Sequence, residues 1–307
     1  YDRFLAEVVN IFEKVRVAGL SAARSLPQET NLVLVLSDGQ ANVGETDLEI
    51  IGQRAYEQRQ NGITTSTLGV GSDYNEALMV ELATQGGGRF YHVRDPQQIA
   101  AYMAGELGEI SALAAQHASL HLTLPQDAAI QPFSSAYGVT SQATVTVGDI
   151  PIDTELEIVL RVLLPAQPAG ARLPIKGVLT YRSPAGNELT TPLNAVTLRY
   201  VAGPSFEFRQ GAVAPVVERV LGQMEARSVL GQARVAATKG AEAARGAAQA
   251  SIDQVREYAA LLGEDRAREA AADQQQVFYS MTAAPSAAKA SVHEAFRRQR
   301  GTKDFDT

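Results

Sequence analysis

Cysteine and tryptophan are absent from this chain of 307 residues, and it contains only four histidines. Without cysteine, disulfide bonds, zinc–thiolate sites and thiol catalysis are excluded. Such a small number of histidines argues against a metal site built from several histidine ligands. No apolar run approaches the length of a membrane-spanning helix, so we expect no membrane span. The formal net charge of −7 argues against general binding of nucleic acid.

The start of the chain shows no charged segment followed by an apolar one, so no signal peptide is visible. The first residue is Tyr1 rather than methionine, and a leader could have been lost with whatever preceded it. We expect a cytoplasmic protein. The negative charge is concentrated before Pro204, since the part that follows holds 13 acidic and 14 basic residues and is rich in alanine. This shift in composition indicates a domain boundary.

Residues 1–115 alternate between strand and helix signals, and we expect an incomplete α/β domain there. The strands are expected at residues 4–12, 14–17, 31–36, 63–70 and 89–93, and the helices at 18–26, 47–60, 75–85 and from Asp95-Pro96 onward. The run at 31–36 is apolar on both faces, as in a central parallel strand. Short loops between alternating elements predict a doubly wound, mostly parallel, Rossmann-type sheet.

Residues 116–203 have the two-residue period of strands, and residues 204–307 have the period of helices. The strands, expected at 119–124, 144–147, 155–164, 173–181 and 195–201, predict an antiparallel β-sandwich. Because the connection at 112–118 holds no proline or glycine, we expect a rigid contact with the α/β domain. The last part predicts two or three helices with a frayed end, and Gly240, Gly246 and Gly263 as bends or turns. These helices either pack on themselves or on the sandwich, or form an arm that docks a partner.

The strongest local signal is Ser37-Asp38-Gly39, which closes the apolar run and leads into Asn42 and Gly44. An apolar strand places Asp38 at the carboxyl edge of a parallel sheet, where ligands of open α/β sheets bind. A carboxylate there suits a hard divalent cation. Glycine and asparagine tolerate the positive φ angles of a tight loop. The alternative, that Asp38-Gly39 is only a turn after a strand, is equally open from these residues.

The order and spacing of several blocks resemble the later half of a bacterial von Willebrand factor A (VWA) domain. The blocks are the Ser-Asp-Gly-Gln-x-Asn-x-Gly loop at 37–44, the segments 47–60, 63–71 and 74–79, and the Gly-Gly-Gly-Arg-Phe-Tyr stretch at 86–91. The resemblance covers about 90 residues. It implies that Asp38 belongs to a metal-ion-dependent adhesion site with Mg²⁺, beside the loop residues Ser37, Gly39, Asn42, Asp73 and Asn75.

The first metal-binding loop of that family, Asp-x-Ser-x-Ser, does not occur in this chain, and no Thr loop matches. The start at Tyr1 resembles the strand after the first helix, so we expect the first strand and its motif to lie before Tyr1. By the same comparison, we expect a segment to be missing between about Val17 and Ala18. We therefore hypothesise a truncation or a joining of separate pieces, which leaves the Mg²⁺ site incomplete.

Other candidates have structural interpretations beside the functional ones. Asp73, Asn75 and Glu76 could shape a ligand surface, but a helix N-cap followed by acidic residues is favoured. Glu45 and Asp47 could add charge near a metal, but helix capping by Thr46 or Asp47 is favoured. His92 is expected in the core or at a sheet edge. His117 and His121 lie in an expected strand, which disfavours a metal pair. Ser37 and Ser66 have no histidine and acid context for nucleophilic catalysis.

Three functions remain open from the sequence. The first is a non-enzymatic scaffold that recruits a protein partner, whose acidic residue completes the coordination of Mg²⁺. The alternative is an accessory subunit of an AAA+ ATPase or chelatase-like machine. An enzyme would need a second acid or base near Asp38, and no such constellation is present, so we expect no enzyme.

Overall fold

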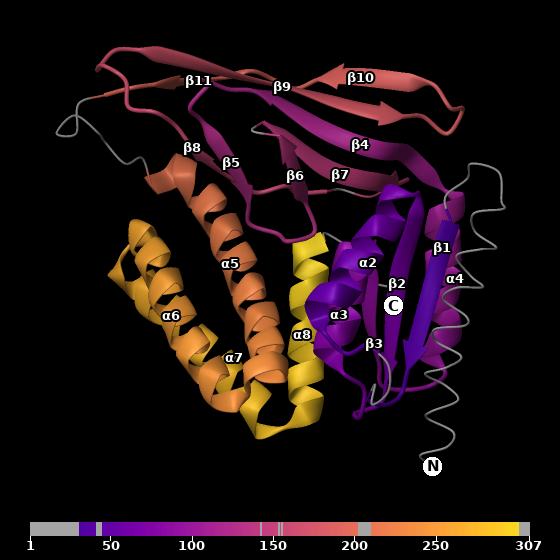
Figure 1. Ribbon diagram of the computed structural model, residues 1–307. Coiled ribbons are helices and arrows are strands. Elements are labelled where there is room, and N and C mark those ends of the chain that lie inside the picture. The colour runs from indigo at the N-terminus through magenta and orange to yellow at the C-terminus, as the bar shows by residue number, and fades with distance from the viewer. Residues whose placement is uncertain are drawn as a thin grey trace.

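The computed structural model describes residues 31–40, 45–141, 143–152, 154, 156–201 and 210–300, and only the backbone of 109–111, 210–213 and 285. Figure 1 shows three parts: a parallel sheet with helices, an antiparallel β-part and a helical bundle. This order confirms the predicted mixed fold class. The elements expected at 4–12, 14–17 and 18–26 lie outside the described residues.

The α/β part is built on three parallel strands in the order β1-β2-β3, namely β1 (Asn31–Ser37), β2 (Ile63–Val70) and β3 (Gly87–Val93). Its helices are α2 (Leu48–Gln60), α3 (Glu76–Gln85) and α4 (Gln98–Ser111). Figure 1 shows α2 and α3 on one face of the sheet and α4 on the other. The predicted segments from 31 to 93 are thus confirmed within two residues. The last helix begins at Gln98 instead of Pro96, because Asp95 caps a turn by accepting the Gln97 N–H.

The antiparallel part is a six-stranded sheet packed on a two-stranded one. The larger sheet contains β4 (Leu113–Thr123), β6 (Gly138–Ser141), β7 (Thr144–Pro151), β9 (Arg172–Arg182), β10 (Glu188–Pro192) and β11 (Val196–Arg199), and the smaller one β5 (Ala129–Pro132) and β8 (Leu160–Leu163). An apolar cluster joins the two sheets, including Leu120 and Val145 from one and Ile130 from the other. Burial of apolar side chains between the sheets holds the two layers together.

Two expectations for this part need correction. The stretch 112–118 is not a connection, because β4 already begins at Leu113 and pairs with β7 and β9. The strand expected at 155–164 is reduced to β8, since the described backbone before Leu160 forms no strand. β5, β6 and β10 were not predicted.

Four α-helices, rather than two or three, make up the described C-terminal part: α5 (Gln210–Lys239), α6 (Ala241–Ala259), α7 (Glu264–Ala283) and α8 (Pro285–Arg300), with the short η2 (Ala260–Leu262) before α7. Gly240 and Gly263, with φ of 84° and 117°, separate successive helices as predicted. The expectation for Gly246 was wrong, because it lies inside α6, where hydrogen bonding of the helix continues through it. Pro285 opens α8, a position at which its missing N–H costs nothing.

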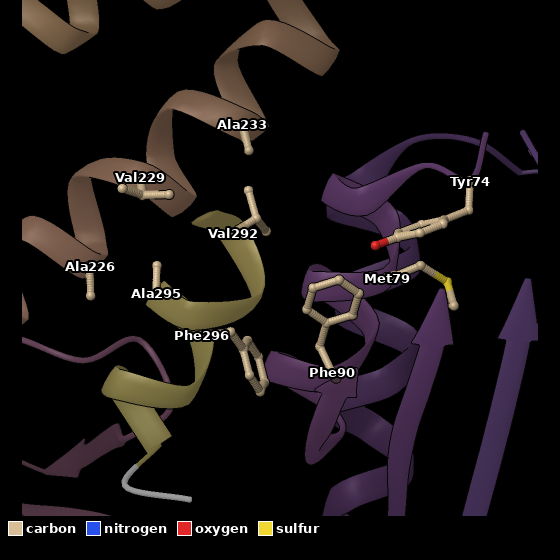
Figure 2. Packing of buried hydrophobic residues seen from close by; sticks show 10 residues of the cluster. Tyr74, Met79, Phe90, Ala226, Val229, Ala233, Val292, Ala295 and Phe296 are labelled. Atoms are coloured by element: carbon tan, nitrogen blue, oxygen red, sulfur yellow. The ribbon is translucent and has the colours of Figure 1, made fainter. Parts of the chain in front are cut away.

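The helical bundle packs against the α/β part, which the sequence did not indicate. Figure 2 shows α8 between α5 and the sheet, with Val292 and Phe296 facing Phe90 and Met79. The Phe90 and Phe296 rings meet edge to face, with centroids 6.0 Å apart. The bundle also reaches the β-part, where the Arg161 guanidinium donates to the Tyr258 hydroxyl at 2.5 Å. The three parts therefore share apolar and polar contacts.

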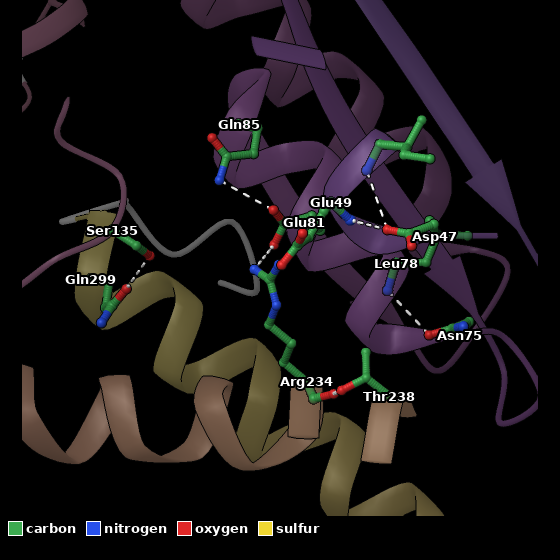
Figure 3. Close-up of polar contacts among 11 residues, drawn as sticks. Asp47, Glu49, Asn75, Leu78, Glu81, Gln85, Ser135, Arg234, Thr238 and Gln299 are labelled. Carbon is green, nitrogen blue, oxygen red and sulfur yellow. Dashed lines mark hydrogen bonds and ion pairs between the residues drawn. The ribbon is translucent and has the colours of Figure 1, made fainter. Parts of the chain in front are cut away.

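An ion pair reinforces this contact between helices from different parts. Arg234 of α5 binds the carboxylate of Glu81 on α3 at 2.7 Å, as Figure 3 shows. The Glu81 side chain is largely buried, with 10% of its surface exposed, whereas Arg234 is half exposed. The packing of α5 on α3 removes the Glu81 carboxylate from water, and the ion pair with Arg234 offsets the cost of this desolvation.

Candidate functional site

The candidate site lies at the carboxyl edge of the parallel sheet. β1 and β2 are paired in register up to Ser37 and Gly69, so the loops that follow them leave the sheet at the same edge. The Gln40 side-chain amide donates a hydrogen bond to the main-chain oxygen of Asp73 at 2.6 Å. The loop with Asp38 and the loop 71–75 therefore lie side by side.

Two acidic side chains of this edge, Asp38 and Asp73, are exposed. Asp38 follows the last residue of β1 directly, and Asp73 lies in the turn after β2. The Ser72 hydroxyl donates to Asp73 Oδ1 at 3.0 Å, and the Ser37 hydroxyl donates to the Gly39 carbonyl at 3.0 Å. Carboxylate oxygens at this edge are thus exposed to solvent, and hydrogen bonds within each loop hold the two loops in place.

The remaining predicted site residues have different positions. Asn42 lies outside the described residues. Asn75 is the N-cap of α3, and its Oδ1 accepts the Leu78 N–H at 3.1 Å (Figure 3). Asp47 caps α2 in the same way by accepting the Glu49 N–H at 2.8 Å. The capping interpretations are confirmed, and the side-chain oxygen of Asn75 is already engaged.

The described residues show no complete set of metal ligands. Among them no three histidine, aspartate or glutamate side chains gather into a group that could hold an ion. At the sheet edge, Asp38 offers one exposed carboxylate. Mg²⁺ needs octahedral oxygen ligands, commonly one or two carboxylates with water. The chemistry of Asp38 suits such an ion, but the described residues alone do not make a complete site.

A buried polar arrangement behind loop 71–75 was missed by the sequence analysis. Tyr74 is fully buried, and its hydroxyl lies 2.9 Å from Nδ1 of His92. Burial and the nearby Glu76 carboxylate raise the pKa of Tyr74, so its hydroxyl stays protonated and shares a hydrogen bond with His92. Lys289 of α8 donates to the Tyr74 carbonyl at 2.6 Å and to Glu76 at 2.7 Å.

A signal for this arrangement was present in the sequence. Lys289 shares the spacing of Val292 and Phe296 along α8, so it falls on the apolar stripe of that helix. A lysine at such a position requires a buried partner. His92 is buried in β3, as expected for a core residue.

Two further histidines, His117 and His121, lie in the β-part. His121 lies between two threonine hydroxyls, with its ring nitrogens 3.1 Å from Thr144 Oγ1 and 2.9 Å from Thr180 Oγ1. His117 has a φ of 51°, at an irregularity of β4, and its N–H donates to Asp149 at 2.8 Å. These hydrogen bonds give both residues structural roles in the sheet.

Comparisons with known proteins identify the α/β part. Residues 7–104 match the family model of the von Willebrand factor type A domain. The uncharacterized protein YfbK of Escherichia coli K12 is 44% identical over 64 residues, which are 20% of this chain and 11% of that protein. The matched stretch is therefore a small part of this relative.

Two solved structures share the fold over nearly the whole chain. A von Willebrand factor type A protein from Catenulispora acidiphila has a TM-score of 0.55 and 14% identity, covering 93% of this chain and 70% of that one. The human COPII-coat protein Sec24c has a TM-score of 0.52 and 12% identity, covering 94% of this chain and 42% of that one. At such identities the likeness concerns the fold alone. The family match thus assigns a von Willebrand factor type A domain to residues 7–104 of this chain.

Proposed function

We propose that this protein is a non-enzymatic interaction module that recruits a protein partner at the carboxyl edge of its parallel sheet. In this proposal Asp38 is one anionic ligand of Mg²⁺, and an acidic residue of the partner is another. The general part, an interaction role, is supported by the family, because von Willebrand factor type A domains generally mediate protein–protein interactions. The position at the sheet edge, the bound Mg²⁺ and the acidic residue of the partner are the more specific parts of the proposal.

The observation that carries the proposal is the joining of two exposed loops at one edge. Gln40 and the Asp73 main chain connect the loop of Asp38 to loop 71–75 at 2.6 Å. Loop 71–75 is in turn anchored from below by the buried Tyr74. Exposed acidic groups on an anchored backbone can form a specific surface, because little conformational entropy is lost when a partner binds.

The polar contacts at this edge favour binding over catalysis. The hydroxyls of Ser37 and Ser72 donate to a carbonyl and a carboxylate, and neither is paired with a histidine base. A nucleophile would need such a base within hydrogen-bonding distance. A metal bound here would supply a positive charge that attracts an acidic group of the partner.

The proposal also predicts how strongly Mg²⁺ binds. Since the described residues supply an incomplete set of ligands, we expect Mg²⁺ alone to bind weakly and the acidic residue of a partner to strengthen the binding. Mg²⁺ and partner should therefore bind cooperatively, each raising the affinity for the other.

The proposal is tested on the full-length natural protein. Partners are captured from a lysate of the source organism with Mg²⁺ or with EDTA, and the affinity of the purified partner is measured by calorimetry. Asp38→Ala should lower the affinity about tenfold or more and remove the effect of EDTA. The control is Asp127→Ala, which removes an exposed carboxylate from the β-part.

Both substitutions affect exposed side chains, so each should change the free energy of unfolding by less than about 0.5 kcal/mol. A partner that binds wild type and Asp38→Ala equally, or equally with Mg²⁺ and EDTA, would rule out the metal-dependent edge. An interaction module without a metal would then remain.

A further inference from the structure

A cleft lies between the α/β part and the β-part, at the end of the parallel sheet opposite to Asp38. Its volume is about 1050 Å³. One wall contains Asn31, Gly62 and Gly87, which lie at or next to the starts of β1, β2 and β3. The other wall contains residues of β4 and β7, such as Gln116 and Asp149. The cleft is therefore separate from the edge to which the proposed function assigns the partner.

Positive charge is concentrated in this cleft. Four arginines from four different elements line it: Arg59 of α2, Arg89 of β3, Arg182 of β9 and Arg300 of α8. The described lining residues include two carboxylates, Glu106 and Asp149. The described lining residues thus carry an excess of positive charge, although the chain as a whole has a net charge of −7.

Both carboxylates accept hydrogen bonds from neutral donors, and each also interacts with an arginine of the cleft, Glu106 with Arg300 and Asp149 with Arg59. Glu106 accepts hydrogen bonds from the Tyr91 hydroxyl at 2.5 Å and the Ser66 hydroxyl at 2.7 Å. Asp149 accepts the His117 N–H at 2.8 Å. These bonds fix the carboxylates in the walls and partly satisfy them there.

The Arg300 guanidinium is held by uncharged acceptors. Its Nε donates to the Gly88 carbonyl at 3.1 Å, and its Nη2 donates to the same oxygen at 2.7 Å and to the Gly87 carbonyl. Burial and the nearby Arg59 and Arg89 cations lower the pKa of Arg300 to about 10, and burial lowers the pKa of Arg59. Like charges in a poorly solvated place repel one another, so an anion between them would be stabilised.

We propose that this cleft binds a small molecule that carries phosphate groups. A guanidinium offers paired N–H donors that match two phosphate oxygens, and several arginines can share one phosphate group or a pair of them. The Thr146 hydroxyl of β7 lines the same cleft and can donate a further hydrogen bond. The volume of the cleft is similar to the volumes of small-molecule binding pockets, which are roughly 300–1,000 Å³.

Inorganic pyrophosphate is the probe for this inference. Calorimetry on the full-length protein in EDTA should show saturable binding that weakens as salt is added. Arg182→Gln should weaken this binding about tenfold or more. The matched control is Arg172→Gln at the far end of β9, where the side chain is exposed and lies outside the cleft, and it should change the affinity less than about twofold.

Further measurements test the chemical class of the ligand and the location of its binding site. If citrate bound as tightly as pyrophosphate, the proposal that the ligand carries phosphate groups would be contradicted. No saturable binding, or equal losses in Arg182→Gln and Arg172→Gln, would overturn the site. If circular dichroism shows that Arg182→Gln does not fold, Arg59→Gln takes its place with the same expected loss. Asp38→Ala should leave pyrophosphate binding unchanged, so failure here is distinguishable from failure of the proposed partner edge.

Discussion

Lys289 and Tyr74 are 215 residues apart in the sequence, yet the Lys289 ammonium lies 2.6 Å from the Tyr74 carbonyl oxygen and 4.0 Å from the centre of its ring. Lys289 thus makes a hydrogen bond and a cation–π contact with one residue. Tyr74 belongs to loop 71–75, whose Asp73 is bonded to Gln40. The last described helix is therefore connected through three residues to the loop that carries Asp38.

Replacing this lysine should destabilise the docking of α8. Lys289→Met keeps the length of the side chain but leaves the Tyr74 carbonyl and the partly buried Glu76 carboxylate without their donor. We expect a loss of about 2–3 kcal/mol in the free energy of unfolding, measured with urea. Lys239→Met, at the exposed end of α5, is the control and should cost less than about 0.5 kcal/mol. Equal stabilities of the two variants would contradict the role of Lys289.

The stability should depend on pH through His92. Burial, Arg94 and Lys289 lower the pKa of His92 from its ordinary 6.5, so the folded protein favours the neutral ring. Between the two pKa values the unfolded chain binds more protons than the folded one, so stability falls as the pH falls. The contribution is complete above pH 6.5 and is lost as the pH drops through the lower folded-state pKa.

The measurement is urea unfolding of wild type and His92→Gln between pH 7.5 and 5. Glutamine can keep a hydrogen bond with Tyr74 but does not titrate in this range. We expect the difference in unfolding free energy between the two proteins to shrink toward pH 5. A difference that stays constant over the whole range would show that His92 has the same pKa in both states.

Two glycines should respond to alanine in opposite directions. A Cβ at Gly88 would lie 2.1 Å from the Thr65 carbonyl oxygen, which is main chain of the neighbouring strand and cannot move aside. Gly246 lies inside α6 with open space around its Cβ position. Gly88→Ala should therefore cost about 3 kcal/mol or more, and Gly246→Ala should stabilise by about 0.5–1 kcal/mol. Thermal unfolding checks both, and the same sign for the two variants would contradict this account.

Local patterns were sufficient for the α/β part. The apolar runs of β1 and β2 and the turn and capping residues between them, such as Asp47 and Asn75, determine elements that depend on near neighbours. β5 and β10 were missed because Ala129–Pro132 and Glu188–Pro192 are short and lack a clear alternating pattern. They are strands because β8 and β9 pair with them, which a local pattern does not report.

The candidate site was predictable only in outline. The position of Asp38 at the end of β1 followed from the apolar run, and the neighbourhood of loop 71–75 followed from parallel pairing. The bond from Gln40 to Asp73 depends on side-chain geometry, and the contact of Lys289 with Tyr74 depends on how a distant helix packs. Such long-range contacts leave only indirect signals, such as a lysine on an apolar helix stripe.

The most direct test of the metal-dependent edge is hydrogen exchange of the full-length natural protein with and without Mg²⁺. Mass spectrometry follows the amides of residues 37–40 and 71–75 in wild type and in Asp38→Ala. If Asp38 binds the ion, Mg²⁺ slows exchange in both loops of the wild type, because Gln40 and Asp73 connect them, and has no such effect in Asp38→Ala. Exchange that is unaffected by Mg²⁺ in the wild type, or slowed equally in Asp38→Ala, would contradict the assignment of Asp38 as a metal ligand.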